Sequence, residues 1–566
     1  MWHMARTVGI GLQSFEKIQQ RQCFYVDKTK FIKEWWENLD DVTLITRPRR
    51  FGKTLTISMT EQFFSIKYAG RGELFEGLSI WEDEKYRKLQ GTYPVISLSF
   101  ANVKETSYES TVQRINQIFT NLYYEYSFLL EGDALLFDEK EDFRSISKGM
   151  PEIMATMALH QLSRFLYKYY HKKVIILLDE YDTPMQEAYV NGYWEELVSF
   201  TRSLFNSTFK TNPYLNRAIM TGITRVSRES IFSDLNNLEV VTTTSEKYAD
   251  CFGFTEEEVF TALDEFGMSD RKQEVKNWYD GFIFGNHTDI YNPWSVLNYL
   301  DKRKVGAYWA NSSSNSLAGK LIREGSKEVK QRLEGLMRGE AFRVEIDEQI
   351  VYGELNTKRN SVWSLLLASG YLKVLQVEYV ETAGRWYHTL ALTNREVRMM
   401  FENMIRGWFS EQDENYNDFI KALLADDLKA MNYYMNKMAL AMFSAFDTGN
   451  KPSEAAEPER FYHGFVLGLL VDLADRYAVT SNRESGFGRY DVMLEPKKDD
   501  DGIILEFKVQ DMEDEKELAD TVKAALQQIE KKKYETILME KGISREKIRK
   551  YGFAFCGKKV LIGTAV

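Results

Sequence analysis

Apolar runs that end in polar residues recur along the first half of the chain. They cover residues 42–46, 174–178 and 216–223, and a helical pattern follows the first run. Continuous apolar runs of this length are typical of strands buried on both faces of a parallel sheet. The pattern predicts an α/β core over residues 1–240, with polar residues gathered at the carboxyl edge where such sheets bind ligands.

The loop after the first run carries a phosphate-binding pattern, because residues 47–54 read Arg-Pro-Arg-Arg-Phe-Gly-Lys-Thr. Glycine lets the backbone approach a phosphate, and N–H groups at the helix start face the anion. Lys53 is expected to reach the β- and γ-phosphates of ATP, and the Thr54 hydroxyl to bind Mg²⁺. The generic pattern begins with glycine where Arg47 stands, so a basic surface loop is the alternative. The predicted nucleotide-binding residues of this loop are Arg50, Phe51, Gly52, Lys53 and Thr54.

Acidic and hydroxyl side chains follow the other two runs. Asp179 is predicted to hold Mg²⁺ and Glu180 to polarise the attacking water. The alternative, a core strand with a solvated acidic turn, weakens because Gly52-Lys53-Thr54 occurs in the same chain. Thr224, or Thr221 before it, is a candidate sensor of the γ-phosphate. Arg225 is a candidate for neutralising transition-state charge, within the chain or from a neighbour.

These motifs in combination resemble the predicted AAA-ATPase-like family of bacteria and archaea. The family's phosphate loop is similar to residues 47–54, so Arg47 fits it. The resemblance implies a P-loop NTPase (AAA-like) fold that binds ATP and Mg²⁺ and hydrolyses ATP slowly, without identifying a substrate. The other matching segments are residues 25–29, 178–182, 221–225, 278–282 and 291–295.

The middle of the chain predicts two further regions. Residues 241–345 show a mainly helical pattern, expected to form a lid after the ATPase core, with Trp278, Tyr279 and Trp294 in packing roles. Residues 346–440 contain a helical stretch that stops at Gly370 and two candidate strands. That order fits either a winged helix, which would suit DNA or a partner, or a plain helix-hairpin spacer.

Near the C-terminus, two predicted strands flank an acidic turn and form an antiparallel hairpin. If Leu494 pairs with Ile503, Asp491 lies opposite Glu506. Opposed carboxylates destabilise a sheet unless a cation compensates them, and Mg²⁺ prefers oxygen ligands. Lys508 shares a strand face with Glu506, so it could orient or activate water, and the same register pairs it with Arg489.

This pattern, Asp followed by Glu-x-Lys, resembles the PD-(D/E)XK nuclease superfamily. The resemblance implies an α/β restriction-endonuclease-like domain over residues 441–566, with Asp491, Glu506 and Lys508 catalytic. Segments 459–464 and 481–491 are also similar; they add Glu459 as a further metal ligand and His463 as a structural partner. Gln528 is expected to face the strand of Glu506. Tyr490 stands where the superfamily usually has proline, so a domain that keeps the fold without activity is the alternative.

The composition of the chain bears on its number of domains, its metal and disulfide content, its location and its binding of nucleic acid. The chain has 566 residues, which exceeds one hydrophobic core and predicts several domains. Three scattered cysteines and six histidines without paired spacing argue against disulfides and zinc. The sequence shows no signal peptide or membrane span, which predicts a cytoplasmic location. The net charge of −11 argues against constitutive DNA coating but allows a local basic cleft.

Together these features predict an ATP hydrolase coupled to a Mg²⁺-dependent nuclease that acts on nucleic acid, with DNA favoured over RNA. The alternative is an ATP-dependent signalling switch whose nuclease-like domain only binds a partner. A structural scaffold is the third option, and two separate constellations of site residues argue against it. No membrane partner is predicted, and a homo-oligomer is left open.

Overall fold

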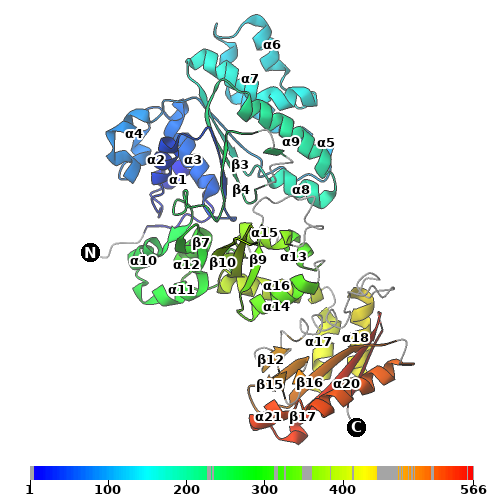
Figure 1. Cartoon of the computed structure of the whole chain (residues 1–566). Helices are drawn as coiled ribbons and strands as arrows, with labels where there is room; N and C mark the ends of the chain where they lie inside the picture. Colours follow the sequence, from blue (N-terminus) through cyan, green and yellow to red (C-terminus); the bar gives the residue numbers. More distant parts are fainter. Residues whose placement is uncertain are drawn as a thin grey trace. The chain divides into compact units, whose positions relative to one another are not determined.

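The computed structural model forms two compact units, residues 1–324 with 335–398 and residues 325–334 with 399–566 (Figure 1). Within the part described, no helix combines the length and apolarity needed to cross a bilayer. The structure describes residues 6–225, 231–232, 235–310, 316–323, 327–346, 360–382, 384–410, 413–442, 470, 473, 476–481, 484–485, 488–489, 491–511, 515–557 and 559–564.

A parallel five-stranded sheet forms the centre of the first unit, as the apolar runs predict. The strand order is β2-β3-β4-β1-β5, so β4 lies between the strand of Asp179 and the strand that precedes residues 47–54, the predicted phosphate loop (called the phosphate loop below). Every residue of β1 and β3 is buried, which explains why these strands are continuously apolar rather than alternating. The strands are β1 (Val42–Thr46), β2 (Val95–Ser99), β3 (Val174–Asp179), β4 (Leu215–Gly222) and β5 (Leu238–Val241).

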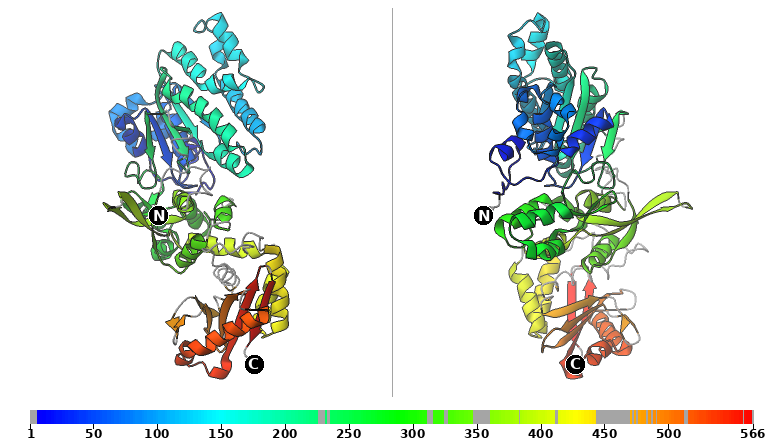
Figure 2. Two further views of the ribbon diagram at one scale, coloured as in Figure 1. Left: turned by 45° about the vertical axis from the view of Figure 1, so that its right-hand side comes forward. Right: turned by 90° about the vertical axis from the view of Figure 1, so that its left-hand side faces the viewer.

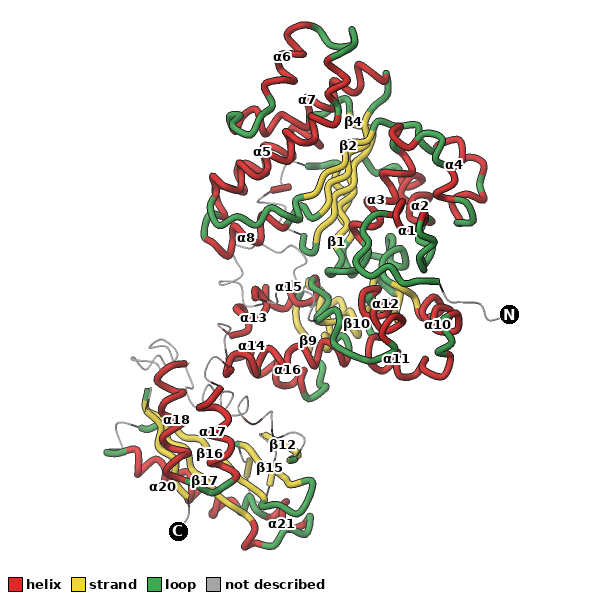
Figure 3. Tube along the Cα trace, turned by 180° about the vertical axis from the view of Figure 1, so that it is seen from behind, coloured by secondary structure: helices red, strands yellow, loops and turns green. Residues whose placement is uncertain are grey.

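Helices cover both faces of this sheet, with α1 to α4 on one face and α5, α7, α8 and α9 on the other (Figures 1 and 3). Aromatic residues such as Phe31, Trp35 and Phe63 fill the first interface. The helices are α1 (Phe15–Gln20), α2 (Lys30–Asn38), α3 (Lys53–Phe64), α4 (Glu84–Leu89), α5 (Tyr108–Glu125), α6 (Phe137–Ser145), α7 (Glu152–Tyr170), α8 (Thr183–Asn191) and α9 (Trp194–Phe205).

The following segment is not purely helical, contrary to the pattern expected after residue 255. Two strands, β7 and β8, join β6 in a small antiparallel sheet. Phe282 and Phe284 are buried while Ile283 between them is partly exposed, and the turn contains Gly285 with φ of 55°. This short alternation is easily hidden between helices. The elements are β6 (Phe254–Thr255), α10 (Glu256–Glu265), α11 (Lys272–Tyr279), β7 (Phe282–Phe284), β8 (His287–Tyr291), α12 (Pro293–Lys302) and α13 (Ser316–Arg323).

The predicted helix, glycine stop and hairpin are present in the last part of the first unit. Gly370 has φ of 83° and follows α15. The hairpin joins a third strand in the order β10-β11-β9. A helix followed by a hairpin is common to both predicted alternatives, the winged helix and the spacer. The elements are β9 (Phe342–Glu345), α15 (Ser361–Ala368), β10 (Leu372–Val380), β11 (Arg385–Leu392) and α16 (Arg395–Ser410), whose residues from 399 on belong to the second unit.

The second unit is built on a mixed five-stranded sheet in the order β12-β15-β16-β17-β18, with β16 and β17 parallel. Helices α17 and α18 cover one face, and α20 and α21 the other (Figure 2). The elements are α14 (Lys327–Met337, shared with the first unit), α17 (Asp413–Leu424), α18 (Leu428–Met442), β12 (Tyr477–Ser481), β13 (Glu484–Ser485), β14 (Gly488–Arg489), β15 (Val492–Pro496), β16 (Gly502–Val509), α20 (Leu518–Lys532), α21 (Thr536–Glu540), β17 (Ile548–Cys556) and β18 (Lys559–Thr564).

Candidate functional site

The phosphate-loop lysine is buried inside the curve of its own loop. Gly52 caps α3 with φ of 85°, a conformation that glycine adopts without strain. The Lys53 ammonium donates to the carbonyl oxygens of Arg47 at 2.8 Å and Pro48 at 2.9 Å. Burial lowers the pKa of Lys53, and the neighbouring carboxylates, Glu180 foremost, oppose that shift. The loop therefore holds a buried cation where a polyphosphate would supply the matching negative charge.

A chain of hydroxyl groups connects the phosphate loop to the ends of β3 and β4. Thr54 Oγ1 donates to Asp179 Oδ2 at 2.7 Å, and the Thr221 hydroxyl donates to Asp179 Oδ1. Thr221 reaches Asp179 because β4 is the direct neighbour of β3. Burial raises the pKa of Asp179. The hydroxyl and carboxylate oxygens of Thr54 and Asp179 are hard donors of the kind that suits Mg²⁺, so this pair fits the predicted ion.

Glu180 leaves β3 in a left-handed backbone conformation, with φ of 52°. Its N–H donates to Thr221 Oγ1 at 3.3 Å, and its Oε2 accepts a hydrogen bond from the Thr183 hydroxyl at 3.2 Å. The carboxylate is half-buried, beside the Asp179 network. Thr221 therefore bonds both the predicted metal ligand, Asp179, and the backbone of the predicted water-polarising residue, Glu180, at the end of β3.

Asp182 is a site residue that the sequence pattern did not single out. Its Oδ2 accepts from the N–H groups of Ile223 at 3.0 Å and Thr224 at 2.9 Å, and from the Thr224 hydroxyl at 2.8 Å. Burial raises the pKa of Asp182. The Thr224 hydroxyl is therefore engaged by Asp182, whereas Thr221 contacts Asp179 directly. Arg225 follows in the same loop and is half-buried.

Arg47, at the position of the generic glycine, is a fully buried structural residue. Its Nη1 donates to the carbonyl oxygens of Thr46 at 2.9 Å and Thr242 at 2.6 Å. Its Nη2 donates to Lys247 O at 3.5 Å and Tyr248 O at 3.4 Å. Burial lowers the pKa of Arg47 to about 10. The guanidinium therefore joins the start of the phosphate loop to the segment after β5.

The next side chains of the loop also face protein rather than the Lys53 ammonium. Phe51 is buried, with its ring centroid 4.7 Å from that of Phe282 and 5.3 Å from that of Phe284. The Arg50 guanidinium lies 4.4 Å from the Trp294 ring centroid. While these side-chain contacts hold, the backbone N–H groups of Arg50 and Phe51 are the atoms that could bind a phosphate.

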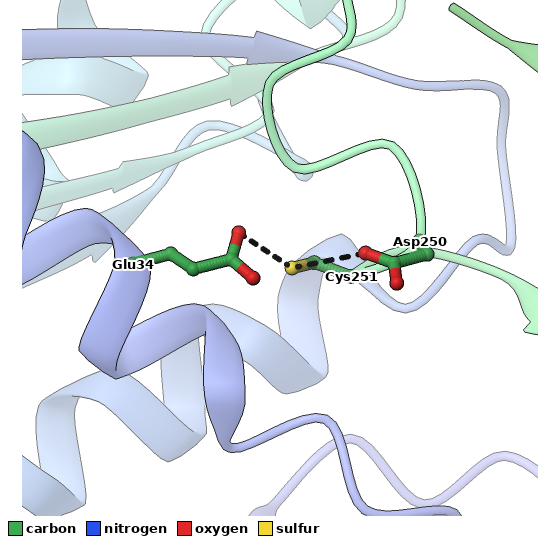
Figure 4. A group of neighbouring side chains, drawn as sticks. All are labelled: Glu34, Asp250 and Cys251. Carbon is green, nitrogen blue, oxygen red and sulfur yellow. Dashed lines mark hydrogen bonds between the residues drawn. The ribbon is translucent and has the colours of Figure 1, made fainter. Parts of the chain in front are cut away.

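The segment that receives Arg47 is held by the group drawn in Figure 4. The Cys251 thiol donates to Glu34 Oε2 at 3.5 Å and lies 4.0 Å from Asp250 Oδ1. Lys30 forms an ion pair with Asp250, and Lys28 Nζ donates to Asp250 O at 2.9 Å. Burial raises the pKa of Cys251, which keeps it a thiol. Glu34, Asp250 and Cys251 lie close enough together to hold a metal ion, but Lys30 already pairs with Asp250.

Replacing Arg47 with glycine, which restores the generic loop pattern, is expected to destabilise the fold by about 3 kcal/mol or more. The change leaves carbonyl acceptors without their donors and opens a cavity beside Phe284, whose ring centroid lies 4.7 Å from the guanidinium. Thermal unfolding followed by circular dichroism would measure the loss. Arg21→Gly, at an exposed helix end, is the matched control. Equal unfolding temperatures for the two variants would contradict a structural role for Arg47.

In the second unit, the hairpin has the register that the sequence predicts. Leu494 pairs with Ile503 and Val492 with Leu505, which brings Asp491, just before β15, beside Glu506 within β16. Asp491 Oδ2 accepts a hydrogen bond from the Phe507 N–H at 2.8 Å. The predicted partnership of Lys508 with Arg489 is wrong. Arg489 pairs with Glu484 in the separate β13–β14 hairpin, because the β15–β16 ladder does not extend that far.

Glu506 is buried, 1% exposed, and accepts a hydrogen bond from Gln528 of α20, as predicted. Gln528 Nε2 also lies 3.2 Å from the Tyr534 hydroxyl. Alternation along β16 puts Glu506 and Lys508 on the face of Ile504, which packs under α20. Oxygen donors at Asp491 and Glu506 fit Mg²⁺. Glu459 and His463 lie outside the described residues.

Each unit thus defines a class. The first is a P-loop-like α/β domain, and the second is a mixed-sheet α/β domain with paired carboxylates. Residues 9–232 match the family model described as predicted AAA-ATPase, and residues 457–565 match that of the PD-(D/E)XK nuclease superfamily. The chain therefore carries an AAA-ATPase-like domain followed by a nuclease-superfamily domain, the arrangement expected from the motifs.

A relative is described as an uncharacterized protein in the vnfD 5′ region of Azotobacter chroococcum mcd 1. It is 26% identical over 392 residues, which cover 69% of this chain and 68% of that protein. Its description names no activity.

Proposed function

We propose that the chain binds and hydrolyses ATP with Mg²⁺. This reaction controls a metal-dependent nuclease-like domain that acts on nucleic acid, with DNA favoured over RNA as the substrate. The observation that carries the proposal is the network of Thr54, Asp179 and Thr221, which joins the phosphate loop to two strand ends through hydrogen bonds. Mg²⁺ held by Thr54 and Asp179 would neutralise phosphate charge. Buried hydroxyl and carboxylate groups arranged in this way suit the binding of a polyphosphate with its metal ion better than they suit core packing, which apolar side chains do at lower cost.

The proposed roles of the chain's own groups follow from their positions. Lys53 exchanges the carbonyls of Arg47 and Pro48 for phosphate oxygens, and the backbone N–H groups of residues 50–54 bind the same anion. Glu180 orients the attacking water and accepts its proton. Arg225 offers positive charge for the transition state, within the chain or across an interface.

The nuclease-like domain is proposed to act through the face of its sheet under α20. Asp491 and Glu506, with Glu459 as a further ligand, would hold a divalent cation that activates water toward a phosphodiester. Lys508 orients that water and balances charge from the same strand face. The register of the hairpin supports this assignment, because it brings Asp491 beside Glu506 of β16.

The alternative is a switch in which ATP occupancy alters a domain that only binds a partner. The net charge of −11 favours it, since nucleic-acid binding normally uses a basic surface. Both proposals share the ATP site and differ only in the chemistry of the second unit.

The test measures ATP binding by calorimetry and phosphate release, with and without Mg²⁺. Cleavage of plasmid, single-stranded DNA and RNA is assayed in parallel, with and without ATP. Asp179→Asn should raise the Mg²⁺ concentration that ATP hydrolysis requires, whereas the exposed loop control Asp133→Asn should not. Wild-type protein that binds no ATP would refute both proposals. ATP hydrolysis without any cleavage would leave the partner-binding switch.

A further inference from the structure

The phosphate loop is tethered by residues that lie far beyond the parallel sheet in sequence. The carbonyl oxygen of Arg49 accepts two hydrogen bonds, from Asn292 Nδ2 at 3.3 Å and from Trp309 Nε1 at 2.9 Å. The Arg50 guanidinium lies over the Trp294 ring, 4.4 Å from its centroid. Two consecutive loop residues are thus held by side chains of the segment around α12.

The tethered residues include one in a costly backbone conformation. Arg50 has φ of 64°, in the left-handed region that a non-glycine residue occupies at a cost of about 1–2 kcal/mol. Free of its contacts, the loop would populate other conformations, in which the N–H groups of residues 50–54 no longer converge. The contacts of residues 49–50 therefore help to keep the N–H groups of residues 50–54 in the arrangement that binds an anion.

One buried carboxylate fixes both tethering elements. Glu396 Oε2 accepts from the Ser295 hydroxyl at 2.8 Å, and Glu396 Oε1 accepts from the Trp309 N–H at 2.7 Å and the Ala310 N–H at 3.4 Å. Ser295 follows Trp294 directly in α12. The Glu396 carboxylate thus bonds to Ser295, the neighbour of Trp294, and to the backbone of Trp309.

Glu396 is itself held firmly at the start of α16. Asn394 caps this helix by accepting from the Val397 N–H at 3.0 Å, and donates to Tyr279 O at 3.1 Å. The Glu396 side chain is fully buried, and burial raises its pKa to about 7. Keeping this group ionised costs folding stability, since the folded chain binds its proton more tightly than the unfolded chain does. A packing role alone would be filled at lower cost by an apolar residue.

We propose that Glu396 is a positioning residue for the phosphate loop. Through Trp309, and through Ser295 beside Trp294, it holds residues 49–50 in the conformation that binds nucleotide. This inference rests on the proposed binding of ATP. Glu396 lies outside the phosphate loop and outside the ends of β3 and β4. It would set the affinity for ATP without touching the nucleotide.

The test compares the KM for ATP and the kcat of full-length Glu396→Gln and Trp309→Phe with those of wild type. The glutamine turns an NH₂ group toward one of the donors, and phenylalanine removes only the indole N–H while keeping an aromatic ring. Both are expected to raise the KM by about ten-fold, which corresponds to releasing Arg50 from its left-handed conformation. The kcat should change little, because Lys53, Asp179 and Glu180 are untouched.

Glu139→Gln separates this effect from a general loss of stability. Glu139 is also a buried glutamate of the first unit, but it pairs with Arg164 and Lys168 on α7, away from the loop. Glu139→Gln should lower the unfolding temperature and leave the KM unchanged. A wild-type KM in both Glu396→Gln and Trp309→Phe would overturn the inference alone. Wild-type protein that binds no ATP would overturn it together with the proposed function.

Discussion

Lys53→Ala is expected to lower the kcat for ATP hydrolysis by about two to three orders of magnitude, the usual loss when one preorganised donor to the transition state is removed. The ammonium is buried and bound only to carbonyls of its own loop among its described contacts, so it is available to a phosphate that enters. Phosphate release at saturating ATP measures the loss. The unfolding temperature should fall less than in Arg47→Gly, because Lys53 donates to two carbonyl oxygens where Arg47 donates to four, and the variant also removes a buried charge.

Lys67→Ala provides the control, because this lysine is partly exposed in the same unit and pairs with Glu125 at 2.8 Å. It should hydrolyse ATP at the wild-type rate. If Lys53→Ala were equally active, residues 47–54 would not be the phosphate loop, and the hydroxyl network around Asp179 would need another explanation.

The second large effect is expected in the other unit. Glu506→Gln should reduce nucleic-acid cleavage by about 100-fold or more, because loss of a metal-binding carboxylate forfeits several kcal/mol of transition-state stabilisation. The amide has the size of the carboxylate, so the neighbouring Gln528 can keep a hydrogen bond by rotating its own amide. Cleavage of labelled DNA and RNA, with Mg²⁺ or Mn²⁺, measures the effect. ATP hydrolysis should be retained, since Glu506 does not belong to the unit with the phosphate loop.

Glu495→Gln is the matched control for this variant. Glu495 lies on β15 of the same sheet and pairs with Lys541. It should cleave as wild type does. Cleavage that survives in Glu506→Gln would mean that the activity resides elsewhere or in a contaminant, and the second unit would then be assigned to partner binding.

The parts of the fold that sequence predicts well are those whose patterns are local. Strands β1 and β3 are continuous apolar runs because both faces are covered, and β16 could be paired with β15 because an acidic turn of defined length joins them. Gln528 could be placed opposite Glu506 from the resemblance to the nuclease superfamily.

The parts that sequence did not reveal depend on contacts between distant segments. Arg47 reads as one basic residue among several, and only the fold shows that it binds the carbonyl oxygen of Thr242. Asp182 looks like part of a solvated turn until β4 places Thr224 against it. Glu396 gives no local signal at all, because the residues it positions lie about 90 to 350 positions earlier in the chain.

The left-handed backbone conformation of Glu180 sets thermal stability against catalytic turnover at this position. A left-handed glutamate costs about 1–2 kcal/mol that glycine would not. Selection for heat resistance alone would therefore reward the loss of this side chain, together with the reaction it is proposed to assist. Variants of this chain that gain thermal tolerance by changing residue 180 should be regarded as trading turnover for durability.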